Sequence, residues 1–190
     1  MNEDTLSHLF QQATEAASKH QYWAALDFYT ELLALIEPQT ASASFQDKLL
    51  TSLRERGRLL GLLGEQEAAL SAYIQYHREA TDPARRIDAL IKIGGQSRGI
   101  GRYNQAVNAY HEALTLAEER RIPAERGRVL VGIGGTKLVR GRIEEAVDYL
   151  KEAIALFEKS WDAAKQIRTM NRFGVAYSYG GQKYLDINTF

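Results

Sequence analysis

Apolar residues recur at three- and four-residue steps along most of the chain, which is the period of an amphipathic α-helix. Ile87, Leu90, Ile91 and Ile93 show this step clearly. We assign no strand, so the pattern predicts an all-α protein. The expected helices lie near residues 4–19, 22–36, 46–62, 66–80, 83–100, 103–120, 124–140, 143–159 and 161–179.

Proline and glycine mark the expected helix ends. Asp82 followed by Pro83 is typical of a helix start, because the carboxylate can accept from first-turn amides and proline gives up no bond at the first helical position. Gly64, Gly101 and Gly141 stand where a first helix should stop, and glycine readily takes the left-handed conformation that closes a helix.

One unit is repeated along the chain. Ile93-Gly94-Gly95 returns forty residues later as Ile133-Gly134-Gly135, and Phe173-Gly174 follows at the same step. We therefore expect a single array over residues 1–190, with units near 4–38, 46–80, 83–120 and 124–159 and a partial fifth unit at 161–190.

A glycine inside a helix costs about 1 kcal/mol relative to alanine, so the repeated glycines need a packing reason. We expect Gly94 and Gly134 to face Ala106 and Ala146, so that the two helices of one unit lie close together. Side chains at the matching aromatic position of the second helices should fill the space toward the next unit; these are Tyr73, Tyr110 and Leu150.

These residues resemble the tetratricopeptide repeat (TPR). The resemblance is carried best by Leu90, Ile93-Gly94, Gly101-Arg102-Tyr103, Ala106, Tyr110, Ala113-Leu114 and the segment Asn171 to Tyr177. The forty-residue period is similar to that of the long-unit subclass found in kinesin light chains, Pins-type adaptors and bacterial TPR regulators. The resemblance implies a right-handed superhelical solenoid of antiparallel helix pairs, in which first helices line a concave wall where partners bind.

Composition narrows the functional classes. Basic and acidic residues number 24 each and there is no cysteine, which excludes a disulfide framework, a zinc-thiolate site and thiol catalysis. Neither a secretion signal nor a membrane span is recognisable, so we expect a cytoplasmic protein without membrane partners. The glycine-rich segment 132–137 lies inside a predicted helix, where its amides are already bonded. We expect no enzyme, cofactor or metal site.

Charge separates by helix type. Residues 83–102 and 124–142 each carry five basic residues and one acidic residue, a net charge of +4. Residues 103–119 carry three acids and no base, and residues 143–159 carry five acids and two lysines, so both have a net charge of −3. If first helices line the concave wall, as the resemblance implies, the concave wall is basic and the outer wall is acidic.

The sequence thus predicts a non-enzymatic interaction module that binds an acidic, partly apolar protein segment. The expected partner-binding residues are Arg54, Arg58, Ile91, Lys92, Gly95, Arg98, Arg128, Val131, Gly135, Arg168, Asn171 and Arg172. The arginines could instead pair with acids of neighbouring second helices and serve stability. The chain could also be a ligand-sensing or regulatory segment of a larger signalling or transcription protein, or a scaffold that forms homo-oligomers through its C-terminal helix. Nucleic-acid binding is disfavoured by the zero net charge.

Overall fold

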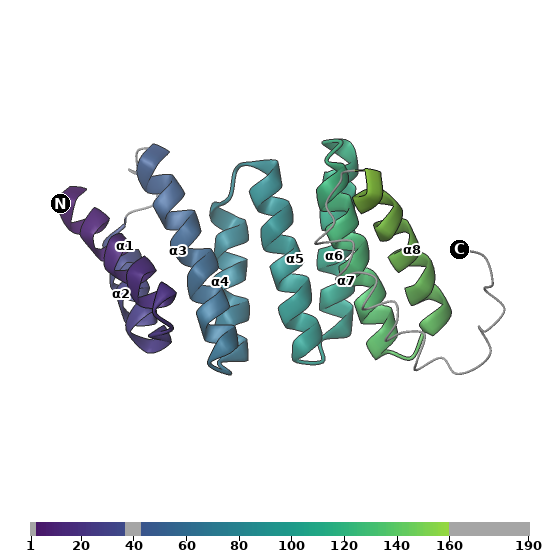
Figure 1. The fold of residues 1–190 in the computed structure, drawn as a ribbon, viewed down its shortest axis with the longest axis horizontal. Helices are drawn as coiled ribbons and strands as arrows, with labels where there is room; N and C mark the ends of the chain where they lie inside the picture. The colour runs from purple at the N-terminus through teal and green to yellow at the C-terminus, as the bar shows by residue number, and fades with distance from the viewer. Residues whose placement is uncertain (1–2, 37–42, 160–190) are drawn as a thin grey trace.

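The computed structural model describes residues 3–36 and 43–159, and every regular element within these two ranges is an α-helix. Figure 1 shows the helices standing side by side in chain order. Their bounds are α1 Glu3–Ser18, α2 Tyr22–Leu35, α3 Ala43–Leu62, α4 Gln66–Glu79, α5 Pro83–Gly99, α6 Tyr103–Glu119, α7 Pro123–Val139 and α8 Ile143–Lys159.

Most predicted bounds agree with these to within one residue. Helix α3 is the exception, since it begins at Ala43 and not near residue 46, and no residue between these positions is a proline or glycine that would stop a helix. The ninth predicted helix at 161–179 lies outside the described residues, as do Arg168, Asn171, Arg172 and the expected self-association surface.

Helix ends follow the predicted chemistry. Asp82 accepts a hydrogen bond from the backbone amide of Arg85 at 2.9 Å, and Pro83 is the first residue of α5. Gly64, Gly101 and Gly141 have φ angles of +87°, +79° and +73°. The pairs of backbone bonds that close such a turn follow each first helix, for example from Gly101 to Arg98 and from Arg102 to Ser97.

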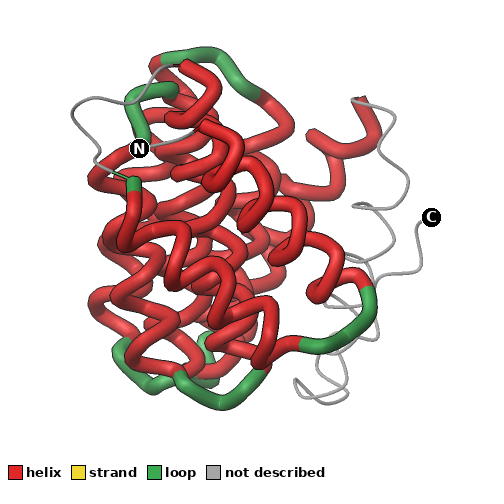
Figure 2. Tube along the Cα trace, turned by 90° about the vertical axis from the view of Figure 1, so that its left-hand side faces the viewer, coloured by secondary structure: helices red, strands yellow, loops and turns green. Residues whose placement is uncertain are grey.

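The helices form four antiparallel pairs that stack into a solenoid. Each helix contacts the next one in the chain, and the first helices α5 and α7 also contact each other directly. Figure 2 shows the stack along its length, with the helices layered one behind another. One cluster of buried side chains extends from α4 through α5 and α6 into α7, so the core is continuous between units. The predicted all-α solenoid is confirmed.

The repeated glycines make room for large side chains. A Cβ atom at Gly94 would lie 2.7 Å from the Tyr110 ring, and one at Gly132 would overlap the same ring from the next unit. At Gly94 the three nearest atoms all belong to the Tyr110 ring, so this ring lies closer to the glycine than Ala106 does. Gly134 does approach Ala146, whose carbonyl oxygen would lie 3.2 Å from an added Cβ. Tyr110 thus reaches from its own unit into the next, as predicted.

We expect Gly132→Ala to lower the free energy of unfolding by about 1–3 kcal/mol through overpacking against Tyr110, which outweighs the helix propensity gained. Urea unfolding followed by circular dichroism measures this. Gly99→Ala is the matched control, because no neighbouring atom lies within 4 Å of its Cβ position and its φ angle is not positive. An unchanged midpoint for Gly132→Ala would contradict the assigned contact.

Buried tyrosines should make the fold sensitive to alkaline pH. Burial, aided by the charge of Glu55 or Asp88, raises the pKa of Tyr29, Tyr73 and Tyr76 to about 12. As pH rises from about 10 to 12, the unfolded chain loses these protons before the folded chain does, so stability falls. The free energy of unfolding should therefore decrease over this window, and the decrease should be shallower in Tyr29→Phe. Equal slopes for the two proteins would exclude Tyr29 as a contributor.

Candidate functional site

The first helices α3, α5 and α7 carry every predicted site residue that the structure describes. Because α5 and α7 contact each other directly across successive units, these helices form the inner layer of the stack. Their side chains that are neither fully buried nor fully exposed include Arg54, Arg58, Lys92, Arg98 and Arg128. We call the surface that these five residues define the inner face.

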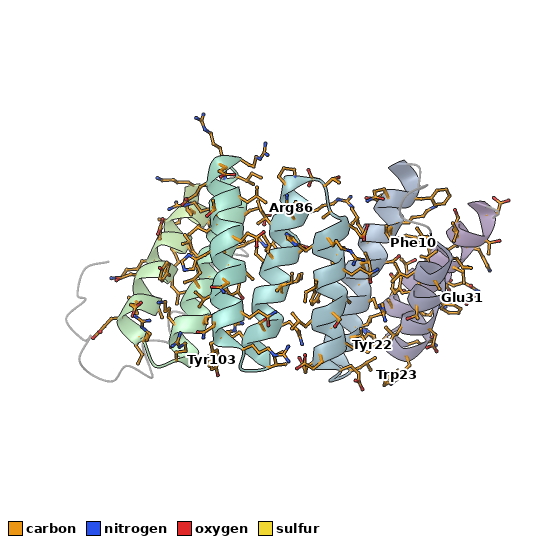
Figure 3. The ribbon with its side chains drawn as sticks, turned by 180° about the vertical axis from the view of Figure 1, so that it is seen from behind. Phe10, Tyr22, Trp23, Glu31, Arg86 and Tyr103 are labelled. Atoms are coloured by element: carbon orange, nitrogen blue, oxygen red, sulfur yellow. The ribbon has the colours of Figure 1, made fainter. Side chains whose placement is uncertain are left out.

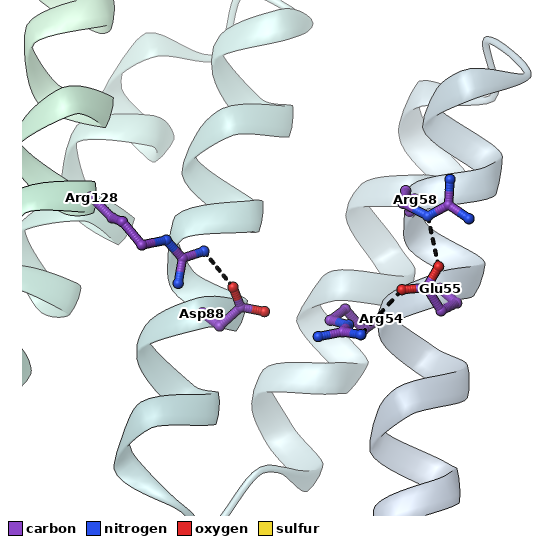
Figure 4. A network of polar contacts seen from close by, with 5 residues as sticks. All are labelled: Arg54, Glu55, Arg58, Asp88 and Arg128. Carbon is purple, nitrogen blue, oxygen red and sulfur yellow. Dashed lines mark hydrogen bonds and ion pairs between the residues drawn. The ribbon is translucent and has the colours of Figure 1, made fainter. Parts of the chain in front are cut away.

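The part of the inner face over α3 and α5 has an excess of positive charge. Arg54 and Arg58 share one carboxylate, that of Glu55, at 3.3 and 2.6 Å (Figure 4). Lys92 makes no ion pair with any described residue, and Arg98 reaches only the carbonyl oxygen of Gly132 at 3.5 Å. Bonds of that length are weak, so the Arg98 guanidinium has no strong hydrogen bond or ion pair within residues 3–36 and 43–159. Apart from Asp88, whose partner is Arg128, Glu55 is therefore the one carboxylate that accompanies these four cations among the described residues.

Arg128 is engaged differently from the other four. Its guanidinium donates to Asp88 Oδ1 on α5 at 2.6 Å and to Glu125 Oε2 on α7 at 2.5 Å. The three side chains are only 27%, 17% and 19% exposed, respectively. Burial would lower the pKa of Arg128, but the bond to Asp88 and the charge of Glu125 raise it overall. Arg128 therefore joins successive units and is not the free cation that the sequence suggested.

Apolar and glycine positions lie beside the cations. Ile91 and Val131 are half-buried and pack against neighbouring core clusters, so each presents only part of its side chain. Gly95 and Gly135 are also half-buried. An added Cβ at Gly95 would meet the Tyr110 hydroxyl oxygen at an ordinary distance of 3.7 Å. Ile91 and Val131 thus add partly exposed apolar atoms to the same first helices that carry the cations.

Several remaining basic residues pair with acids of second helices, as the stability hypothesis for the arginines expects. Arg102 bonds Glu67 of α4 at 2.8 Å, and Lys137 bonds Glu145 of α8 at 2.7 Å. Arg126 bridges Glu118 of α6 and Glu152 of α8. Part of the basic charge of the first helices is thus paired with acids of the same chain. The net charge of +4 counted for each segment therefore overstates the positive charge available for binding a partner.

A cavity of ≈ 280 Å³ opens between α3, α4, α5 and α7. Its lining consists of Leu50, Thr51, Arg54, Tyr76, Ala84, Arg85, Asp88, Glu125 and Arg128. The sequence pattern predicted Arg54 and Arg128 as site residues but not Asp88 and Glu125. Their signal was present, since each is the lone acid of an otherwise basic segment and Glu125 precedes Arg128 by three residues.

Metal-binding and membrane-spanning features are absent from residues 3–36 and 43–159. Within these ranges, no three histidine or acidic side chains come together in an arrangement suited to a metal ion. None of the helices α1 to α8 combines the length and the apolar character that crossing a membrane requires. In the glycine-rich segment at 132–137, Thr136 bonds the carbonyl oxygen of Gly132 within α7 at 2.9 Å, as expected of helix and not of a phosphate-binding loop.

No protein-family model and no curated protein matches this chain. Solved structures do match. Aspartyl phosphate phosphatase F from Bacillus subtilis superposes with a TM-score of 0.75 and 18% identity over 93% of this chain, which spans 45% of the phosphatase chain. A putative kinesin light chain with nearly identical TPR-like repeats from Podosopora anserina gives a TM-score of 0.69 and 16% identity, covering 94% of this chain and 88% of the other.

A Rap protein in complex with competence and sporulation factor is also similar, with a TM-score of 0.61 and 14% identity over 90% of this chain and 53% of the other. At these identities the likeness concerns the fold alone. It confirms a TPR-type helical-repeat architecture, as the residue pattern suggested.

Arg128→Gln should lower the free energy of unfolding by about 1.5–3 kcal/mol, because it removes two charge-assisted bonds and leaves Asp88 and Glu125 without their shared cation. Arg58→Gln is the matched control, since its pair with Glu55 is more exposed and should contribute less than about 1 kcal/mol. Adding Asp88→Asn to Arg128→Gln should restore part of the loss. Equal losses for Arg128→Gln and Arg58→Gln in urea unfolding would contradict this role.

Proposed function

We propose that this TPR-like solenoid is a non-enzymatic interaction module whose inner face binds an acidic, partly apolar protein segment. The supporting observation is the charge excess over α3 and α5. Arg54, Arg58, Lys92 and Arg98 have one carboxylate, Glu55, as their only ion-pair partner among the described residues. Positive charges next to apolar surface are partly desolvated, and without counter-ions this costs free energy. Carboxylates of a bound segment would offset this cost through charge-assisted hydrogen bonds.

The contact would combine two kinds of interaction. Guanidinium groups form charge-assisted and often bidentate bonds with carboxylates, which fix the position of acidic side chains. Ile91 and Val131 offer partly exposed apolar atoms to the side chains between them. Because stacked helices hold these groups in place beforehand, binding would spare the cost of ordering a flexible receptor.

The comparison with a Rap protein supports binding of a partner by such a solenoid. That protein was solved with competence and sporulation factor bound, and its chain is about twice as long as the part that this chain matches. The inner face of the present chain differs in one respect from a uniformly basic groove, because Arg128 is already neutralised by two acids. We therefore place the acidic part of the partner over α3 and α5 and not over α7.

A random peptide library selected on the immobilised protein tests this proposal. We expect the selected peptides to be enriched in Asp and Glu next to apolar residues. Lys92 and Arg98 have no carboxylate partner in the part of the chain that the structure describes. Reversing both with Lys92→Glu and Arg98→Glu should weaken peptide binding more than about a hundredfold, because charge-assisted contacts are lost and repulsion is added. Binding measured by fluorescence anisotropy should also weaken as salt is added.

Glu144→Lys is the matched charge-reversal control. Glu144 is exposed in the first turn of α8, and no ion pair of this side chain is present among the described residues. Its reversal should leave peptide binding unchanged. Selection of basic peptides, or full binding by the doubly reversed variant with an unchanged circular dichroism spectrum, would refute the inner face as the acidic-segment site.

A further inference from the structure

We propose that the cavity between α3, α4, α5 and α7 binds a small zwitterion of the free α-amino-acid class. The cavity measures ≈ 280 Å³, far more than the roughly 30 Å³ that one water molecule occupies in the liquid. It is just below the roughly 300–1,000 Å³ typical of ligand pockets, which favours a small molecule over a long segment.

Both signs of charge line the cavity. Guanidinium groups come from Arg54 on α3, Arg85 on α5 and Arg128 on α7, and carboxylates come from Asp88 on α5 and Glu125 on α7. In Figure 4, Arg54 extends from α3 on one side while Asp88 and Arg128 meet on the other. A ligand between them would therefore meet a cation on one wall and a carboxylate on the opposite wall.

The hydrogen-bonding capacity of these walls is not exhausted. Asp88 uses Oδ1 for Arg128, whereas its Oδ2 is buried without a hydrogen-bond partner. Figure 4 shows this second oxygen directed away from Arg128 and toward the side where Arg54 lies. The Nε of Arg54 is likewise buried without a partner, and the terminal nitrogen of Arg54 bonds Glu55 only at 3.3 Å. An acceptor and a donor of opposite charge thus remain unsatisfied beside one cavity.

Charge balance selects the ligand class. A simple anion would be attracted by Arg54 but repelled by Asp88 and Glu125. A simple cation would be attracted by these two carboxylates but repelled by Arg54. Arg85 and Arg128 already have carboxylate partners, Asp47 for the former and Asp88 with Glu125 for the latter. A zwitterion adds no net charge, and its carboxylate can face Arg54 while its ammonium group faces Asp88.

Neighbouring groups would complete the contact. Tyr76 lines the cavity, and a tyrosine hydroxyl is protonated at neutral pH and can donate a hydrogen bond. Thr51 provides a second hydroxyl, and Leu50 and Ala84 provide apolar surface for a side chain. This site is distinct from the acidic-segment contact proposed above over α3 and α5, although Arg54 and Arg128 of the inner face both line the cavity.

Isothermal titration calorimetry of the intact chain with each common free L-amino acid tests the proposal. We expect at least one to bind at millimolar concentration or below. Its carboxamide, which lacks the negative charge, and its N-acetyl form, which lacks the positive charge, should each bind at least about tenfold more weakly. Failure of every amino acid to bind, or equal binding of a blocked form, would overturn the zwitterion site.

Variants then locate the ligand. Arg54→Gln should weaken binding of the amino acid about tenfold but leave binding of its carboxamide unchanged, because only the carboxylate contact is removed. Ala84→Phe should block the cavity from an exposed position in the first turn of α5. Arg86→Gln is the control, since Arg86 is exposed on the same helix, does not line the cavity and is seen on the rear face in Figure 3.

Failure of the amino-acid site can be distinguished from failure of the proposed peptide contact. Lys92→Glu with Arg98→Glu should leave amino-acid binding intact, because neither residue lines the cavity. If Arg54→Gln and Ala84→Phe, both folded by circular dichroism, bind the amino acid as tightly as the parent, the ligand binds elsewhere and the assignment is refuted.

Discussion

The architecture depends on how closely neighbouring helices approach around the ring of Tyr110. This ring comes from α6 and is held between Gly94 of α5 and Gly132 of α7, at positions where even a Cβ atom would collide with it. Since a packed core transmits small displacements, the distance between α5 and α7 follows from this one side chain. The direct contact of α5 with α7 in turn makes the first helices the inner layer.

That spacing also determines the electrostatics of the inner face. Arg128 can bridge Asp88 of the preceding unit because the two helices are close. Toward α3, Arg54 and Arg58 meet only Glu55 on their own helix, and Lys92 and Arg98 remain without a carboxylate among the described residues. The same row of first helices therefore presents a neutralised part over α7 and a cationic part over α3 and α5, with a cavity of mixed charge between them.

Features set by local chemistry could be predicted from the sequence, whereas features set by distances between helices could not. The left-handed glycines at 64, 101 and 141 and the cap at Asp82 depend on a few adjacent residues, and all were predicted. The contact of Gly94 with the Tyr110 ring was not predicted, because the repeat pattern assigns a residue to one face of its helix but does not say which side chain of the next helix packs there. Counting charges per helix likewise missed that Asp88 and Glu125 hold Arg128.

The overall neutrality of the chain constrains how either proposed site can act. With equal numbers of acidic and basic residues, the molecule has no net charge to attract a charged partner over a distance, and exposed charges are screened beyond roughly 8 Å at physiological salt. Discrimination must then arise at contact, where partly desolvated groups interact more strongly. Such contacts affect how long a bound molecule stays more than how fast it arrives. A half-buried arginine with an incomplete set of partners, such as Arg54, is suited to this kind of short-range selection.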